Sequence, residues 1–125
     1  MNSKQIVVIV VLVGLLMVSS PMFAHHSMAM YDRSREVTFQ GTVTKFRFIN
    51  PHTQILFDVE DGNGNVDQWI SFSPSPNRMR REAGWNRKTI KPGDRIAISG
   101  YIARDGRKIM STLKIILNGK ELNIG

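Results

Sequence analysis

The residues best suited to chemistry gather in one short stretch near the N-terminus. The segment Ala24–Met30 contains two of the three histidines and two of the seven methionines of this 125-residue chain. If the chain is cleaved after Ala24, His25 becomes the first residue and offers a metal ion both its α-amine and its imidazole. An α-amine has an ordinary pKa of about 7.7, so a metal displaces its proton readily at neutral pH.

The donor atoms of this stretch favour copper. His26 adds a second imidazole, and nitrogen-rich sites favour Cu(II), which stands highest in the divalent affinity series. Met28 and Met30 add thioether sulfur, which suits Cu(I). We therefore predict a copper cofactor, with a solvated arm whose histidines bind no metal as the alternative.

The third histidine, His52, follows Asn50 and Pro51 in a turn signal. Proline fixes φ and cannot donate to a β-ladder, so a strand must end here. His52 would bring a rigid third ligand to His25 and His26 if the arm folds back over this turn. The alternative is a turn histidine that hydrogen-bonds a backbone carbonyl.

Residues 1–24 have the pattern of a secretory signal peptide. Lys4 supplies the positive start, residues 6–18 are an uncharged apolar run, and a short segment with small residues ends at Ala24. The run is shorter than the roughly 18 to 20 apolar residues of a spanning helix. We expect a periplasmic or secreted bacterial protein. The alternatives are an uncleaved membrane anchor and a cleavage after Ala29 that removes both histidines.

The amino-acid composition limits which kinds of site, partner and activity the chain can have. The chain has no cysteine, which excludes disulfides, thiolate metal ligands and cysteine nucleophiles. Its formal net charge is +7, which favours anionic partners such as lipid head groups or polysaccharide, and export makes nucleic acid the least expected of them. Catalytic motifs are absent, and Asp61–Asn65 lacks the closing glutamate of a calcium loop, so no enzymatic activity is indicated.

We expect an extended arm over residues 25–35 and one mainly β domain over residues 36–125. Alternating apolar residues and turn signals predict five strands, over residues 36–49, 54–60, 66–72, 95–103 and 109–117, with a short sixth near residue 122. A helix is expected at residues 77–83, with Ser75 as N-cap and Gly84 as its end. We expect Trp85 to pack this helix onto the barrel. Three strands, a helix and two or three strands favour a small OB-like barrel, with a flat sheet as the alternative.

The phase of the apolar residues predicts which side chains face the core. In the first strand the phase slips by one after Val43, which indicates a bulge, and Gly41 allows a bend there. In the predicted strand 66–72, the inward residues are expected to be Val66, Ile70 and Phe72. In the predicted strand 109–117, they are expected to be Ile109, Leu113, Ile115 and Leu117.

A basic cluster is the second candidate site. Its members lie on the predicted helix and the segment after it: Arg78, Arg80, Arg81, Arg87, Lys88, Lys91 and Arg95. With Trp85 nearby, they could form an anion-binding face, since OB-type barrels bind oligonucleotides and oligosaccharides on one face. A solvated basic surface without a ligand is the alternative.

Several short motifs occur in a fixed order: Ala-His-His-Ser at 24–27, Gly-x-Val-x-Lys at 41–45, Asn-Pro-His at 50–52, Gly-Trp at 84–85, Lys-Pro-Gly-Asp at 91–94 and Gly-Tyr at 100–101. In this set the chain resembles an uncharacterised family of small secreted bacterial proteins, over roughly residues 24–117. The resemblance implies a periplasmic OB-like barrel and no established activity. Met28 and Met30 exceed the methionine content that it implies, so a thioether role would be particular to this chain.

Three functions follow as hypotheses. The first is a periplasmic copper-binding module for carriage or sequestration, with His25, His26 and His52 as ligands, assisted by Met28 or Met30. The second is an interaction module that binds an anionic polymer or lipid through Arg78, Arg80, Arg81, Arg87 and Lys88. The third is a structural protein of the cell envelope.

Overall fold

The chain folds into a small β-barrel with one short helix. The computed structural model describes residues 1–8 and 28–125, and residues 3–8 are helical. The elements are β1 (Val37–Arg47), β2 (Thr53–Glu60), β3 (Val66–Ser73), α2 (Pro76–Ala83), β4 (Arg95–Ile102), β5 (Ile109–Leu117) and β6 (Lys120–Leu122). No helix in the described ranges is long and apolar enough to cross a bilayer. Residues 9–24 of the predicted signal peptide lie outside the described ranges.

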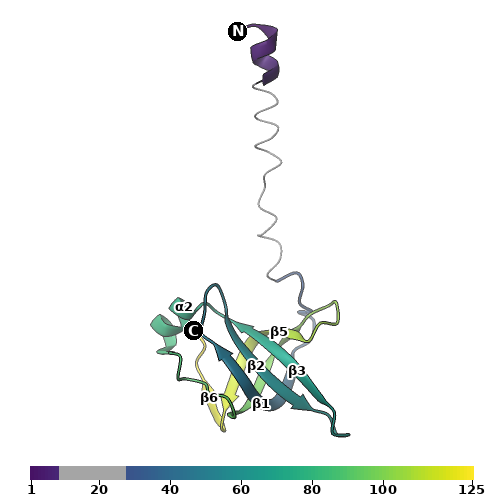
Figure 1. Cartoon of the computed structure of the whole chain (residues 1–125), viewed down its shortest axis with the longest axis vertical. Coiled ribbons are helices and arrows are strands. Elements are labelled where there is room, and N and C mark those ends of the chain that lie inside the picture. The colour runs from purple at the N-terminus through teal and green to yellow at the C-terminus, as the bar shows by residue number, and fades with distance from the viewer. Residues whose placement is uncertain (9–27) are drawn as a thin grey trace.

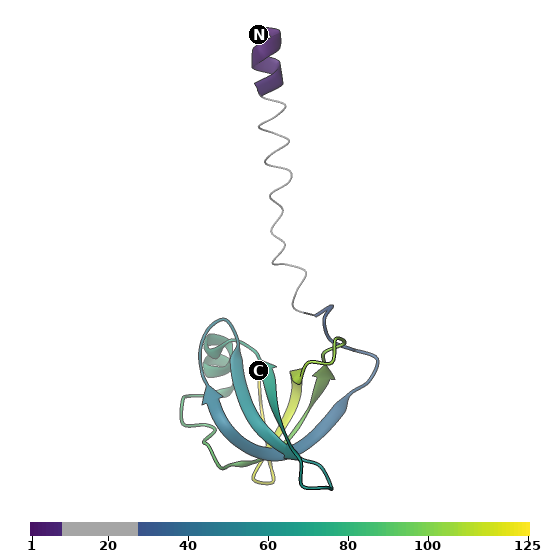
Figure 2. The ribbon, with the colours of Figure 1, turned by 45° about the vertical axis from the view of Figure 1, so that its right-hand side comes forward.

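The barrel is closed by five strands. The sheet order is β3-β2-β1-β4-β5-β6, and a parallel pairing of β3 with β5 joins its two sides. An ion pair between Lys108 and Asp67 spans the same closure. Figures 1 and 2 show the strands wrapped around a common interior, with α2 beside one end. The predicted OB-like barrel is therefore confirmed, including its sixth short strand and the helix between β3 and β4.

β1 serves both halves of the barrel because it bends. Its first half pairs with β4 and its second half with β2, and the register with β2 shifts between Val43 and Lys45. Thr44 is the extra residue of this bulge, as the slip in the apolar phase predicts. Figure 2 shows the resulting curvature of the strand. A Cβ at Gly41 would lie 2.3 Å from the Asp58 carbonyl oxygen, so the bend also depends on a residue without a side chain.

A second bulge lies between β4 and β5. The register shifts after Ser99, which pairs with Lys114, to Gly100, which pairs with Thr112. Leu113 is the extra residue and is 42% exposed, so its predicted inward orientation is wrong. The bulge reverses the face of every residue before it, and Met110 fills the interior in place of Leu113.

The inward face of β3 also differs from the prediction. Ser71 pairs with the fully buried Ile55, and directly paired residues point to the same side of a sheet. Ser71 and Ser73 therefore face the interior, while Val66 is 53% exposed. The hydrophobic pattern selected the wrong face because β3 places hydroxyl side chains, rather than apolar ones, in this part of the core.

α2 packs against the core beside one end of the barrel. The Ser75 hydroxyl accepts a hydrogen bond from the Arg78 amide, Pro76 occupies the first turn, and Gly84 ends the helix with φ of 71°. Met79 and Trp85 are buried, at 0% and 3% exposure. The predicted helix, its cap and its tryptophan anchor are confirmed. The Trp85 indole also donates a hydrogen bond of 2.7 Å to the Asn123 carbonyl, which joins the segment after β6 to the helix.

Candidate functional site

Three segments lie at one end of the barrel. Figures 1 and 2 show the β1–β2 loop and the β4–β5 loop at the same end of the barrel as residues 28–32, opposite the β2–β3 hairpin. We call the surface formed by residues 28–32, 48–52 and 103–108 the arm end. Two of its segments contain predicted metal ligands, so the arm end is the first candidate site.

The β1–β2 loop exposes His52 to solvent, and the residues at both ends of the loop are buried. Phe48 on one side of the loop and Thr53 on the other are buried, at 7% and 0% exposure. Between them, Ile49 and His52 are exposed, and the Asn50–Pro51 peptide bond is cis. The imidazole therefore extends from a short loop that is fixed at both ends.

The arm is docked onto the barrel from residue 28 onward. Tyr31 forms a β-bridge with Ala103 and is 6% exposed, so its ring is part of the packed structure. The Asp32 amide donates a hydrogen bond of 2.8 Å to the Ile102 carbonyl, and the Tyr31 amide donates one of 3.2 Å to the Met28 carbonyl. Burial raises the pKa of the Tyr31 phenol. The arm thus adds a short strand-like segment to the end of β4.

Arg104 holds the arm with both its backbone and its side chain. Its amide donates a hydrogen bond of 2.8 Å to the Met30 carbonyl, and its guanidinium Nε donates one of 3.2 Å to the Tyr31 carbonyl. Sequence reasoning missed this residue, because a charged residue in a hairpin loop resembles any solvated turn residue. The sequence offered one sign that the arm is docked, namely the aromatic residue Tyr31 in a segment with many polar residues.

Two acidic side chains at the arm end are already engaged. Hydrogen bonds from Ser34 hold the pKa of Asp32 below its ordinary value. The Arg107 backbone amide and guanidinium do the same for the pKa of Asp105, with the guanidinium nitrogen 2.7 Å from the carboxylate. Both carboxylates are therefore ionised at neutral pH and satisfied by neighbours within two residues in sequence.

The predicted metal ligands are only partly placed by the structure. Met28, Met30 and His52 are all described and lie at the arm end, with Met28 43% exposed. His25 and His26 lie outside the described residues. Within residues 1–8 and 28–125, no three His, Cys, Asp or Glu side chains come close enough to hold a metal ion. The predicted three-histidine site therefore stays a prediction.

A cluster of buried hydroxyls lies inside the barrel, where β2 begins directly after His52. Ser71 and Ser73 both hydrogen-bond the Thr112 hydroxyl, the latter at 2.8 Å. Thr112 in turn donates to the Phe72 carbonyl at 3.0 Å. The Thr53 hydroxyl is fully buried beside them and has no hydrogen-bond partner among the described residues. Sequence reasoning missed this cluster, because it took the apolar residues of β3 as the inward ones.

Replacing Thr53 by valine is expected to leave stability unchanged or to raise it by about 1 kcal/mol. A buried hydroxyl without a partner costs roughly 1 to 3 kcal/mol, and valine keeps the shape while removing that group. Thr112→Val is the matched variant, and it should lower stability by at least about 1 kcal/mol because it breaks a connected set of hydrogen bonds. Urea unfolding of both variants measures the difference, and a clear loss for Thr53→Val would contradict the expectation.

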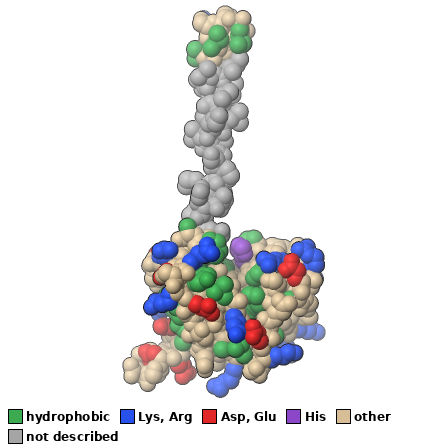
Figure 3. Space-filling view, turned by 180° about the vertical axis from the view of Figure 1, so that it is seen from behind, with side chains coloured by type: hydrophobic (Ala, Val, Ile, Leu, Met, Phe, Trp, Pro, Cys, Tyr) green, Lys and Arg blue, Asp and Glu red, His purple; other side chains and the backbone are tan. Residues whose placement is uncertain are grey.

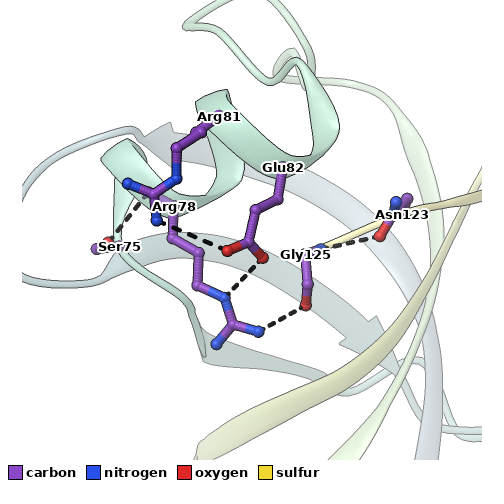
Figure 4. A network of polar contacts seen from close by, with 6 residues as sticks. All are labelled: Ser75, Arg78, Arg81, Glu82, Asn123 and Gly125. Carbon is purple, nitrogen blue, oxygen red and sulfur yellow. Dashed lines mark hydrogen bonds and ion pairs between the residues drawn. The ribbon is translucent and has the colours of Figure 1, made fainter.

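Part of the predicted anion-binding cluster is engaged with the protein itself. Figure 4 shows Arg78 reaching toward both Glu82 and Gly125. Its Nε lies 3.0 Å from the Glu82 carboxylate, and its terminal nitrogen donates a hydrogen bond of 3.0 Å to the Gly125 carbonyl. Arg81 lies 3.7 Å from the same carboxylate. The hydrogen bond from Arg78 is the main reason why the pKa of Glu82 is lowered.

The other members of this cluster differ in whether their side chains contact neighbouring groups. The Arg80 guanidinium lies 5.3 Å from the centre of the Phe48 ring, a cation–π contact. Arg87 and Lys88 are exposed, and no ion pair among the described residues involves them. Figure 3 shows Lys and Arg side chains interspersed with Asp and Glu on one face of the barrel, without a single large basic patch.

A shallow polar groove of about 540 Å³ lies away from the arm end. Residues of the five strands β1 to β5 and of the β5–β6 turn line it, among them Asp58, Glu60, Arg95 and Asn118. Sequence reasoning did not identify it, because its residues come from strands that are far apart in the chain. Of the predicted site residues it contains Arg95, a member of the basic cluster.

Comparison with known families identifies the wider group. Residues 12–111 match a family described as "Family of unknown function (DUF6152)". The chain belongs to this family. The expectation of an uncharacterised family is therefore confirmed, whereas the export of the protein and the assignment of its short motifs to the family stay predictions. The family has no stated activity, and no curated protein matches the chain.

The description of the DUF6152 family assigns no ligand-binding role to any residue. The matched range includes His25, His26 and His52 together with Tyr31 and Arg104. The functional argument therefore rests on the geometry of the arm end and on the donor atoms that the chain can bring there.

Proposed function

We propose that this protein is an exported metal-binding module, that its metal is copper, and that it serves carriage or sequestration in the periplasm. The ligands are the amine and imidazole of His25 and the imidazoles of His26 and His52. Met28 and Met30 assist when the copper is reduced. An enzymatic role is not part of the proposal.

One observation carries the proposal: the arm is anchored at the end of the barrel that presents His52. Met28 and Tyr31 are fixed there by the contacts of Tyr31 with Ala103. Two residues of chain reach at most about 7 Å, and His26 stands two residues before Met28 in the sequence. The arm histidines are therefore tethered to the same end as the loop histidine.

The donor chemistry of this end agrees with copper better than with harder metals. Calcium and magnesium prefer several carboxylate oxygens, and the Asp32 and Asp105 carboxylates already have partners. Imidazole and amine nitrogens suit Cu(II), and thioether sulfur suits Cu(I). The chain has no cysteine, so imidazole, amine and thioether are the donors of this stretch that suit the two oxidation states.

Native mass spectrometry of the exported protein, with Cu(II) added in steps, tests the proposal. We expect a mass that begins at His25 and one tightly held copper ion per chain. The same measurement on the His52→Ala variant should show weaker retention of that ion. A mass that begins at Met30, or a wild-type protein that retains no copper, would rule the proposal out.

An anion-binding role is the second candidate, and it rests on the exposed Arg87 and Lys88 side chains together with the net charge of +7. Binding to vesicles that contain anionic lipid would weaken steeply as salt is raised, because exposed charges are screened beyond about 8 Å at physiological ionic strength. Copper chelation should respond little to salt. The salt dependence of whichever ligand is retained therefore separates the two candidates.

A further inference from the structure

The sequence contains two Asn-Gly pairs, and the structure places each of them in a hairpin turn. Asn63 and Gly64 lie in the turn between β2 and β3, and Asn118 and Gly119 form the turn between β5 and β6. All four residues are exposed. An asparagine before glycine loses its side-chain amide more readily than other asparagines, because glycine has no side chain to hinder attack by its own backbone nitrogen. Both pairs share this chemistry, so a difference between them has to come from the fold.

The reaction needs only the chain and water. The backbone nitrogen of the glycine attacks the side-chain carbonyl carbon of the asparagine, and ammonia leaves with the proton of the glycine amide. The product is a five-membered succinimide ring. Water then opens the ring at either carbonyl, which leaves aspartate or isoaspartate in the chain. Ring closure requires rotation of the asparagine side chain and of its ψ angle, so hydrogen bonds that fix the side chain or the turn slow the reaction.

Asn118 is held by two hydrogen bonds to the backbone of Arg95. Its side-chain oxygen accepts one of 3.2 Å from the Arg95 amide, and its own amide donates one of 2.9 Å to the Arg95 carbonyl. Asn118 has φ of 49° and Gly119 has φ of 85°, and these two residues alone separate β5 from β6. Positive φ at both central residues is the geometry of a tight hairpin turn. The Asn118 side chain must therefore break its hydrogen bond, and the turn must change shape, before the ring can close.

Asn63 is held through its backbone alone. Its amide donates a hydrogen bond of 2.8 Å to the Asp61 carboxylate, whereas its side-chain amide makes no hydrogen bond to any residue that the structure describes. The Gly64 amide donates a long bond of 3.3 Å to the Asp61 carbonyl. A Cβ at Gly62 or Gly64 would meet no atom within 4 Å, so there is open space around this turn. The Asn63 side chain and the Gly64 nitrogen can therefore approach each other at the cost of one weak hydrogen bond.

We propose that Asn63 is a site of spontaneous deamidation in the folded protein and that the β5–β6 turn protects Asn118 from the same reaction. The modification lies on the hairpin that Figure 1 shows at the far end of the barrel from residues 28–32, so it does not depend on the proposed metal site. It lowers the formal net charge of +7 by one. The new carboxylate shares its turn with Asp61, whose pKa is lowered by hydrogen bonds from Asn65 and Asn63. The isoaspartate form also lengthens the backbone of this turn by one methylene group.

Incubation of the folded protein in mildly alkaline buffer tests the proposal. Samples are digested at intervals, and mass spectrometry follows the conversion of amide to acid in the two peptides that contain Asn63 and Asn118. We expect Asn63 to convert at least about tenfold faster than Asn118, because Asn118 must first lose hydrogen bonds that the Asn63 side chain does not make. Equal rates, or faster conversion at Asn118, would overturn the proposal.

The same protein unfolded in guanidinium chloride is the matched control. The two rates should converge there, because the hydrogen bonds that hold Asn118 are lost. A difference of the same size in the unfolded chain would show that the fold is not its cause and would contradict the proposal. Conversion of both residues in the unfolded chain and of neither in the folded protein would also contradict it. Asn63→Gln should abolish the fast conversion, since glutamine has to close a larger ring, and thermal unfolding checks that the barrel of this variant is intact.

Discussion

Replacing Gly100 by alanine is expected to destabilise the barrel by about 3 kcal/mol or more, which is the high end of the cost of overpacking. A Cβ at this position would lie 1.9 Å from the Ser111 carbonyl oxygen and 3.0 Å from the Met110 terminal methyl group. The first of these atoms is backbone and belongs to the neighbouring strand, so it cannot move without breaking the β4–β5 bulge. Chemical unfolding in urea measures the loss directly.

The matched control is Gly62→Ala in the β2–β3 hairpin. A Cβ there meets no atom within 4 Å, and Gly62 is not among the glycines with positive φ. This variant should stay within about 0.5 kcal/mol of wild type, as most surface substitutions do. Equal stability of Gly100→Ala and Gly62→Ala would show that the close approach of β4 and β5 is not as described.

Replacing His25 by alanine is expected to weaken Cu(II) binding about 100-fold or more, equivalent to about 2.7 kcal/mol. His25 supplies the imidazole half of the proposed N-terminal chelate, and changes that only touch the surroundings of a metal ligand already cost 10- to 100-fold, roughly. Competition against a chelator of known strength measures the effect. The intact mass must first establish that the variant begins at residue 25.

A second change isolates the α-amine. Inserting one glycine between Ala24 and His25 keeps every imidazole and moves the amine away from the His25 ring, so affinity should also fall. Arg87→Ala is the control, since it removes an exposed charge and no metal donor. Unchanged copper affinity in both the His25→Ala and the glycine-insertion proteins would contradict the N-terminal chelate.

Much of the architecture was predictable because it depends on local signals. Turn residues and alternating apolar side chains predicted every strand, and Ser75 with Gly84 predicted the bounds of α2. The bulge in β1 was visible as a slip in its apolar phase after Val43. Each of these features depends on the preferences of a few neighbouring residues, which a single sequence displays.

The faces of β3 and β5 were not predictable in this way. Ser71 points inward because it is paired with Ile55, and Leu113 points outward because the second bulge shifts its register against Gly100. Both outcomes are set by a partner strand rather than by the residue itself. A serine or a leucine carries no local signal that reveals such a partner.

For the candidate site, the sequence by itself determined the donor atoms: three histidines, the methionines near the N-terminus and the absence of cysteine. Only the tertiary structure decided that the arm is docked through Tyr31 and Arg104, and that it is docked at the barrel end that carries His52. The physical reason is that side-chain chemistry belongs to each residue alone. Proximity between residues 31 and 103 arises from strand pairing across the fold, which no local pattern encodes.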